Sequence, residues 1–438
     1  MSVVAGSVGS ALGAIVGREG MQEASGARAS FAVDGLVPRW VIRPAALEQV
    51  SRVLALAWDA GLAVVPRGSG AALELGAPPA RLDIVLDLRG LDQVIEYNPD
   101  DLTISVQAGV TAGALAARLA PHHQLLPLDP AGAARRTLGG LAATNASGPL
   151  RARYGTLRDL VLGVRFIQAD GVVTWGGAKV VKSVSGYDVP KLLVGALGTL
   201  GVLGELTLRL HPMPPAEATW LASFRELAGV QAFVARLLDS SVQPNRVELL
   251  NDAALETCGV GPAAAGVAVS IGTAEAAVRA QGETVALLAR AAGGALTRLG
   301  DGFWAAYPRA MAPDGGVLLQ VGTLATEVAT TAAEIEGAVA AGGGGGRAAV
   351  TGCCPLGSLR AWLPGDDVRA VGTIVARLRA LVAPIGGRVV IRRAPAAVRA
   401  AVDPWGPVDP GEWALMRGLK AEFDAKRVLN PGRFVGGL

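Results

Sequence analysis

The segment GLAVVPRGSGAALE, residues 61–74, joins an apolar run to a glycine-rich turn. The run Leu62–Pro66 predicts a buried strand, and Arg67-Gly68-Ser69-Gly70 follows it directly. Several backbone N–H groups of such a turn can point at one anion, because glycine adopts conformations closed to other residues. No Walker lysine follows, and Leu73 stands where a Rossmann turn needs its third glycine. The segment therefore predicts an anion-binding turn outside those two nucleotide-binding classes.

The sequence around this turn follows a βαβ-like pattern. Apolar residues recur at helical spacing from Leu47 to Ala57, and DIVLDL, residues 83–88, is a second apolar strand. Residues 102–107 alternate apolar and polar side chains, as a half-buried strand does. Residues 161–177 contain two strand-like runs joined by an Ala-Asp-Gly hairpin signal, and a helix is expected from Tyr187 to Leu197. The pattern predicts a mixed fold, α+β with α/β character.

Composition excludes several classes of protein. The 438 residues carry a net charge of +3 without a basic block, which argues against nucleic-acid binding. Three cysteines, two of them adjacent, suit neither a disulfide framework nor a zinc or iron–sulfur site, so no metal is expected and the cytoplasm is the expected compartment. The uncharged residues 1–17 are expected to form a frayed or small-residue arm, and no other stretch is expected to span a membrane.

Proline clusters and composition divide the chain. Met213-Pro214-Pro215 marks a boundary, and residues 216–384 are rich in alanine and glycine without a recognisable motif. Near the end, EWALMRGLKAEFD predicts a helix with Leu415, Met416, Leu419 and Phe423 on one stripe. The predicted units are an N-terminal arm (1–39), a first domain (40–215), a cap for substrate or subunit contacts (216–384) and a C-terminal segment that returns to the first domain (385–438).

Two further glycine-rich stretches resemble the first turn in composition. LPLDPAGAARRTLGGLAATNASGP, residues 126–149, combines Gly139, Gly140 and Gly148 with short polar side chains. GALGTLGVLG, residues 195–204, places four glycines among apolar residues. Such small residues let a backbone approach a flat, bulky group, although a packing seam between helices uses the same residues.

Residues 40–215 resemble the FAD-binding domain of the vanillyl-alcohol oxidase and p-cresol methylhydroxylase (PCMH) type. The resemblance rests on VVPRGSG, SVQAGV, LPLDP, TLGGLAATNASGP and the terminal LNPGRF. VKSVSGYDVPKLLVGALGTLGVL, residues 181–203, resembles the family of FAD-binding E-type subunits of bacterial glycolate oxidase. That family implies a two-subdomain FAD-binding fold with an inserted α+β cap. It also implies a second flavoprotein subunit and an iron–sulfur subunit as partners.

The resemblance implies an FAD site built from all three glycine-rich stretches. The turn would cradle the diphosphate, residues 137–148 would line the isoalloxazine and ribityl side, Gly201 would lie by the adenosine, and Asn430 would close the pocket. Ala71 and Ala72 stand where relatives that attach FAD covalently carry histidine, so non-covalent FAD is predicted. The implied cofactor residues are Pro66, Arg67, Gly68, Ser69, Gly70, Asp129, Pro130, Thr137, Gly139, Gly140, Ala143, Thr144, Asn145, Gly148, Gly201, Val202 and Asn430.

This chain lacks histidine motifs that family members use to bind and oxidise their substrates. Family members that oxidise 2-hydroxy acids carry a His-x-His pair and a Glu-His-Gly segment in the cap, whereas His122, His123 and His211 all precede residue 216. The catalytic residues are therefore unknown, with Tyr154, Tyr187 and Arg153 as weak candidates. Arg135, Arg136 and Arg151 lie near the flavin segment and could bind an anion or remain solvated surface charges.

Three interpretations follow from these residues. The first is an FAD-binding subunit of a complex that oxidises a small 2-hydroxy acid, glycolate to glyoxylate, and passes electrons to the iron–sulfur partner. The second is a self-sufficient FAD-dependent 2-hydroxy-acid dehydrogenase, and the third is a structural flavoprotein subunit without catalysis. The missing cap histidines favour the first and third. For the first, a cytoplasmic enzyme is expected, with any membrane association made through its partners.

Overall fold

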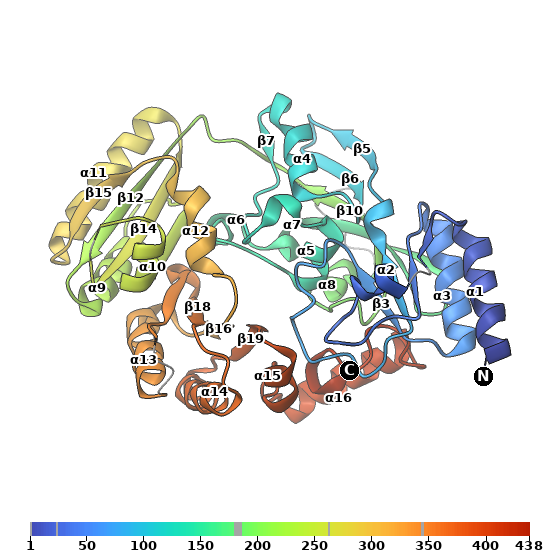
Figure 1. Ribbon diagram of the computed structural model, residues 1–438. Helices are drawn as coiled ribbons and strands as arrows, with labels where there is room; N and C mark the ends of the chain where they lie inside the picture. Colours follow the sequence, from blue (N-terminus) through green and yellow to red (C-terminus); the bar gives the residue numbers. More distant parts are fainter. Residues whose placement is uncertain (1, 23–24, 179–185, 262, 343–345) are drawn as a thin grey trace.

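The computed structural model describes residues 2–22, 25–178, 186–261, 263–342 and 346–438. The chain folds into two lobes (Figure 1). The first lobe comprises residues 2–212 and 409–438, and the cap lobe comprises residues 216–402. The chain as a whole combines helices with three main sheets, which confirms the predicted α+β class. The cap is inserted between two parts of the first lobe.

A four-stranded sheet holds the glycine-rich turn. Strands β2 (Trp40–Ile42), β4 (Ile84–Asp87) and β3 (Val64–Arg67) are parallel, and β1 (Met21–Gln22) adds an antiparallel edge. Helix α3 (Leu47–Ala60) buries its apolar face and ends at Gly61, whose φ of 63° closes the helix before β3. The predicted strand, helix and second strand are confirmed.

The N-terminal residues form a helix rather than a frayed arm. Helix α1 (Ser2–Val16) packs on α3, and the side chain of Leu12 is fully buried between them. Gly9 lies against the side chain of Trp40 and Gly13 against that of Met21, so small residues do occur where this helix meets β1 and β2. The expectation of a frayed end was wrong.

A five-stranded antiparallel sheet forms the second part of the first lobe. Its order is β5 (Val94–Asn98), β6 (Thr103–Gln107), β10 (Val202–Arg209), β8 (Val161–Ile167) and β9 (Val173–Gly177), and β8 and β9 form the predicted hairpin. Strand β6 is buried on both faces, not on one as expected. Its polar face is satisfied inside the lobe, since the hydroxyls of Ser105 and Thr207 are hydrogen-bonded at 2.8 Å.

The cap lobe is an eight-stranded antiparallel sheet covered on both faces. Alternate residues of β14 contact opposite layers, with Val267 facing the α9 and α11 side and Ala268 facing α10 and α12. The sheet order is β15 (Ala295–Leu299), β12 (Ala216–Phe224), β14 (Ala265–Thr273), β13 (Arg246–Asn251), β17 (Ala349–Cys353), β18 (Ser358–Leu363), β16 (Val317–Gly322) and β19 (Val389–Arg393). The first face carries α9 (Leu227–Leu238), α11 (Glu275–Ala291), α13 (Val328–Ala341) and α14 (Val368–Val382), and the second carries α10 (Asp252–Thr257) and α12 (Phe303–Met311).

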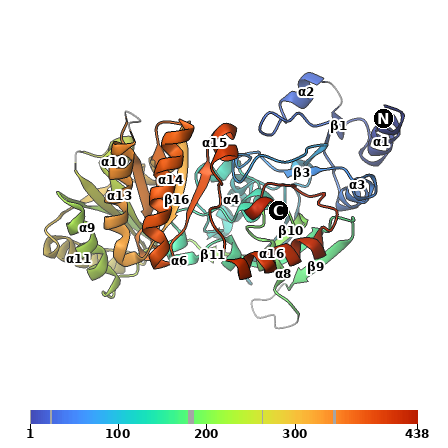
Figure 2. The ribbon, with the colours of Figure 1, turned by 90° about the horizontal axis from the view of Figure 1, so that it is seen from below.

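The cap sheet extends beyond residue 384. Strand β19 pairs with β16, and α15 (Ala396–Ala401) packs against α14. The residues grouped at the sequence level as a C-terminal segment, 385–438, therefore supply the last cap strand before they return to the first lobe. Figure 2 shows this path from α15, beside the cap lobe, to α16 (Pro410–Phe423) along the first lobe. Much of the glycine run 342–346 lies outside the described residues.

Helices α8 and α16 differ from their predicted forms. Helix α8 covers only Val189–Leu193, because glycines with positive φ follow at 195 and 198. In α16 the side chain of Leu415 is 72% exposed, whereas Lys420 is 2% exposed. The expected apolar stripe is thus only partly the buried face: Met416 and Phe423 are half-buried, and Phe423 packs against the core, whereas Leu415 and Leu419 are exposed. The buried pair of Lys420 and Asp424 completes the face that contacts the lobe.

Candidate functional site

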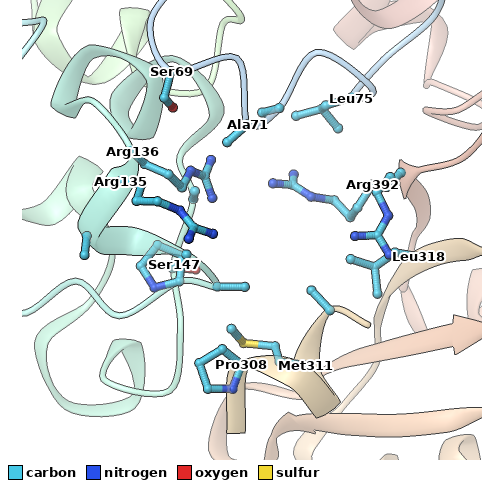
Figure 3. Close-up of a pocket in the computed structure, with 18 of the residues that line it drawn as sticks. Ser69, Ala71, Leu75, Arg135, Arg136, Ser147, Pro308, Met311, Leu318 and Arg392 are labelled. Carbon is cyan, nitrogen blue, oxygen red and sulfur yellow. The ribbon is translucent and has the colours of Figure 1, made fainter. Parts of the chain in front are cut away.

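A cavity of about 1190 Å³, here called the interlobe cavity, lies between the two lobes. The first lobe contributes Ser69 and Ala71 from the glycine-rich turn, together with the segment from Pro130 to Thr137. The cap contributes the end of α12 and the facing ends of β18 and β19. Figure 3 shows these side chains pointing into one space from both sides. Residues more than 200 positions apart in sequence therefore meet here.

A narrower pocket of about 80 Å³, here called the turn pocket, adjoins the cavity. Ser69, Ala71, Ala72 and Arg136 line both spaces. The full lining of the turn pocket is Pro66, Arg67, Gly68, Ser69, Gly70, Ala71, Ala72, Leu73, Arg136, Gly140, Ala143, Thr144, Leu197, Asn430 and Arg433.

The turn requires glycine at two positions, one because a neighbouring side chain approaches closely and the other because its φ is positive. A Cβ atom built on Gly68 would lie 1.9 Å from Oγ1 of Thr137. Thr137 cannot move away freely, because its hydroxyl accepts a hydrogen bond from the backbone N–H of Gly140 at the start of α5 (Leu138–Thr144). Gly70 has a φ of 81°, in the left-handed region that favours glycine. The turn thus brings the end of β3 against α5 with room only for backbone.

The C-terminal segment closes the turn pocket from the other side. Asn430 donates a hydrogen bond through Nδ2 to the carbonyl of Leu197. Arg433 donates to the carbonyls of Leu73 and Leu75, at 3.0 Å for Leu75, and so holds the loop that follows the turn. Arg67 places its guanidinium over the ring of Phe31 at 4.4 Å. A segment beyond residue 400 thereby fixes a loop near residue 74.

The lining of the turn pocket suits the diphosphate of a dinucleotide such as FAD. Three buried polar atoms of its lining, Nε of Arg67, Oδ1 of Asn430 and Nε of Arg433, have no partner among the described residues. Buried polar atoms are normally hydrogen-bonded, so three such atoms without a partner indicate that a bound group contacts them. Two guanidiniums beside glycine N–H groups suit a diphosphate. Arg67, Arg433 and the turn would hold that diphosphate, and FAD would supply a two-electron acceptor next to the interlobe cavity.

The structure gathers eleven of the seventeen implied cofactor residues around these two spaces. They are Pro66, Arg67, Gly68, Ser69, Gly70, Pro130, Thr137, Gly140, Ala143, Thr144 and Asn430. Asp129, Gly139, Asn145, Gly148, Gly201 and Val202 line neither.

The three glycines among these other residues lie outside the linings and allow close contact between neighbouring chain segments. A Cβ on Gly148 would lie 2.0 Å from the carbonyl of Asp129, and one on Gly201 would lie 2.8 Å from the ring of Phe166. Gly139 packs in the same way on Ala108.

Asp129, Asn145 and Val202 have other surroundings. Asp129 accepts from the backbone N–H of Leu150 at 3.0 Å and pairs with Arg246 of the cap at 3.1 Å, so it joins the two lobes. Burial raises the pKa of the Asp129 carboxyl, although Arg246 opposes that shift. Asn145 ends α5 with a φ of 41°, and Val202 is buried in the core.

Arginines dominate the interlobe cavity. Arg135 and Arg136 line it from the first lobe, whereas Arg360 on β18 and Arg392 on β19 line it from the cap. Burial together with repulsion from Arg360 lowers the pKa of both Arg136 and Arg392 to about 10. The cavity therefore favours anions.

Sequence reasoning missed Arg360, Arg392 and Arg393, and also Arg433 of the turn pocket. The first three lie in segments whose surrounding residues give no motif, and single arginines are usually solvated. Only the pairing of β16 with β18 and β19 aligns these side chains with the flavin segment. Arg433 carried a usable signal, since it follows the recognised Asn-Pro-Gly turn directly.

The weak catalytic candidates lie outside both spaces. Tyr154 packs edge-on against His211 with ring centroids 4.9 Å apart, and Arg153 is exposed beside it. Tyr187 is 95% exposed. Among the described residues, the linings of the two spaces contain no histidine, tyrosine, lysine or cysteine. The catalytic roles of Tyr154, Arg153 and Tyr187 therefore stay predictions, without support from this geometry.

A buried carboxyl lies behind the cationic wall. Glu248 on β13 accepts a hydrogen bond from the hydroxyl of Tyr307 on α12, and both side chains are about 1% exposed. Burial raises the pKa of Glu248 to about 7, against smaller opposing effects of Tyr307, Arg360 and Arg151 and a smaller supporting effect of Asp129. The Glu248 carboxyl thus changes its charge near neutral pH.

We expect Glu248→Gln to flatten the pH dependence of stability. Because the pKa is raised from 4.5 to about 7 on folding, the native state binds the proton more tightly than the unfolded state. The stabilisation is complete below pH 4.5 and is lost as the pH rises to about 7. Thermal unfolding across that window should show a weaker decline for Glu248→Gln than for wild type. The exposed Glu283→Gln is the matched control, and an unchanged slope in the Glu248 variant would contradict the assignment.

Among the described residues, no group of three or more histidine, cysteine, aspartate or glutamate side chains could hold a metal ion. No helix in the described part of the chain is both long and apolar enough to cross a membrane.

Comparisons with known proteins agree with the geometry of the turn pocket. Residues 38–177 match the FAD binding domain family, and residues 407–434 match the C-terminal domain of FAD linked oxidases. These two segments contain the glycine-rich turn and the closing Asn430, respectively. The family matches support FAD as the cofactor and give no indication of covalent attachment.

Curated relatives and solved structures extend this likeness. The chain is 32% identical over 252 residues to a probable mitochondrial D-lactate dehydrogenase of Danio rerio, covering 56% of this chain and 50% of the relative. It is 29% identical over 246 residues to the glycolate oxidase subunit GlcD of Bacillus subtilis, covering 55% and 52%. The chain thus spans about half the length of these relatives.

A solved p-cresol methylhydroxylase with substrate bound is similar in fold, with a TM-score of 0.78 at 16% identity over 98% of this chain and 96% of that one. This likeness covers both lobes. Residues 38–177 and 407–434 thus match an FAD binding domain and the C-terminal domain of FAD linked oxidases, and the chain as a whole has the fold of this methylhydroxylase.

Proposed function

We propose that this chain is the FAD-binding subunit of a glycolate-oxidase-type complex that oxidises a small 2-hydroxy acid and passes electrons to an iron–sulfur partner. The observation that carries the proposal is the interlobe cavity, which Arg360 and Arg392 of the cap line together with Ser69 and Ala71 of the glycine-rich turn. Figure 3 shows Arg392 on the cap side of this space, opposite the first lobe. A guanidinium binds a carboxylate through two parallel hydrogen bonds, and this orients a hydroxy acid as well as attracting it.

The lining explains why a partner is included in the proposal. Oxidising an alcohol requires a group that accepts the hydroxyl proton. Among the described residues, Asp314 is the only ionisable group of the cavity lining that is not an arginine. A second subunit would supply the missing base, and likewise the iron–sulfur ligands. The name of the Bacillus subtilis relative, a subunit of glycolate oxidase, supports such an assembly.

Two other functions remain distinct from this proposal. A self-sufficient dehydrogenase is favoured by the cap arginines, which this chain contributes by itself, and it would use Asp314 as the base. A structural flavoprotein subunit would keep the turn pocket without turnover. We place the leading complex in the cytoplasm, with any membrane association through its partners.

The visible spectrum of the purified chain tests cofactor and function together. We expect a yellow protein whose colour is released into the supernatant on acid precipitation, because no side chain suited to attachment lines the described pockets. We also expect the flavin to stay oxidised with glycolate or D-lactate under anaerobic conditions, and to be reduced once the partner subunits are added.

Each contrary outcome identifies a different error. Colour that remains in the pellet contradicts non-covalent FAD. Bleaching by substrate without partners favours the self-sufficient dehydrogenase. A flavin that stays oxidised with every 2-hydroxy acid even in the full complex favours the structural subunit.

A further inference from the structure

The interlobe cavity holds more cationic groups than one carboxylate can use. Arg135 and Arg136 stand on the first-lobe wall, and Arg360 and Arg392 stand on the cap wall. Figure 3 shows Arg135 and Arg136 facing Arg392 across the cavity. Among the described residues, none of these four guanidiniums lies within ion-pair distance of a carboxylate.

The other polar contacts of the four arginines are with neutral groups. Arg136 donates to the hydroxyl of Thr144 at 3.3 Å, and Arg360 donates to the carbonyl of Ser147 at 2.6 Å. These bonds orient the guanidiniums and bring no negative charge to them. The carboxyl groups of Asp129 and Glu248 interact electrostatically with Arg360, but from beyond ion-pair distance. By contrast, Arg89 at the edge of the cavity is paired with Asp87 at 2.7 Å. Arg309 and Arg393 of the cap line the cavity as well, and no described carboxylate lies within ion-pair distance of either, so the unpaired charge is greatest on the cap wall.

FAD accounts for only part of this charge. Its diphosphate would lie at the turn pocket, where Arg67, Arg136 and Arg433 line the space. Arg135, Arg360 and Arg392 line the interlobe cavity but not the turn pocket. Holding unpaired cations together is unfavourable: burial first, and then repulsion from Arg360, Arg136 and Arg151, lowers the pKa of Arg392 to about 10. A ligand with a single charge would leave part of that repulsion in place.

We propose that the interlobe cavity takes a small 2-hydroxy acid with a second anionic group, a carboxylate or a phosphate, one anion facing the cap arginines and the other Arg135. The inference rests on the proposed function and narrows its substrate class from monocarboxylates such as glycolate to dianions. The cavity of about 1190 Å³ leaves room for the longer molecule beside a flavin ring.

Binding of unreactive analogues tests the charge requirement without turnover. The FAD-loaded chain is titrated with propionate, succinate and 3-phosphonopropionate at constant ionic strength, and the change in flavin absorbance reports the dissociation constant. We expect both dianions to bind at least about tenfold more tightly than propionate, because a second charge-assisted contact adds about one such factor. Succinate and the phosphonate together show which second anion is preferred.

Variants of the two walls locate the second anion. We expect Arg135→Ala to weaken succinate binding about tenfold or more and to leave propionate binding almost unchanged. Arg392→Ala should weaken both ligands. Arg369→Ala, an exposed arginine of α14 outside the cavity, is the control and should change neither. The flavin content of each variant verifies that the FAD site is intact.

The outcomes separate this inference from the proposed function. The proposal of a dianionic ligand would be overturned if propionate and succinate bound with equal affinity, or if Arg135→Ala weakened the binding of both to the same extent. If glycolate then reduces the flavin in the complex, the proposed function stands without it. If succinate binds tightly but neither D-malate nor 3-phospho-D-glycerate reduces the flavin in the complex, dianion binding is supported and the proposed oxidation is wrong.

Discussion

Gly68→Ala is expected to produce a protein that folds but binds FAD about ten- to a hundredfold more weakly, because overpacking at such a site costs about 1–3 kcal/mol. The new methyl group would lie 1.9 Å from Oγ1 of Thr137. Relief requires the turn to move away from α5, which separates the N–H groups of the turn from Asn430 and Arg433 across the pocket. The ratio of flavin to protein absorbance after gel filtration measures the loss, and fluorescence titration with FAD gives the affinity.

Two further variants identify the cause. Thr137→Ala in the Gly68→Ala background removes the hydroxyl that clashes, so flavin binding should return in part, reduced by a helix-cap cost of about 1 kcal/mol. Gly418→Ala adds the same methyl group on the exposed face of α16, where nothing lies within 4 Å, and should leave flavin content unchanged. Wild-type flavin content in the Gly68→Ala single variant would show that the turn does not contact the cofactor.

Lys420→Met is expected to lower the free energy of unfolding by about 3–5 kcal/mol, the usual effect of removing one partner of a buried ion pair. The ammonium of Lys420 donates to Asp424 at 2.7 Å and to the carbonyls of Thr199 and Leu429 at 2.8 and 3.0 Å. Without it, the Asp424 carboxylate keeps only its bonds from the backbone N–H groups of Val428 and Leu429. Urea unfolding followed by circular dichroism measures the change.

Lys420 also helps to position Asn430, which lines the turn pocket. Leu429 immediately precedes Asn430, so loosening its carbonyl should weaken FAD binding along with stability. Lys426→Met is the matched control, since that exposed ammonium bonds only the carbonyl of Trp58 and lies over its ring. We expect the control to change stability by about 0.5 kcal/mol or less. Equal effects in the two variants would mean that the buried pair does not set the position of α16.

Sequence patterns were reliable where one short segment carries its own signal. The strand before Gly68, the helix ending at Gly61 and the β8–β9 hairpin depend on neighbours within a few residues. The same patterns placed only part of the buried face of α16: Phe423 packs against the core as expected, but the apolar side chain of Leu415 is exposed and the charged Lys420 is buried. A periodicity locates a helix but does not say which face finds a partner, because that partner lies elsewhere in the chain.

The glycine-rich turn, the short polar residues after it and the final Asn-Pro-Gly carry the resemblance to FAD-binding domains, whereas their physical chemistry alone predicted an anion-binding turn and close approach of the backbone. The cationic cavity was decided by tertiary structure alone. Arg135 comes from a loop of the first lobe, and Arg360 and Arg392 come from strands more than 200 residues later. No local rule relates these positions, because only the pairing of the cap sheet and the docking of the two lobes bring their charges to one space.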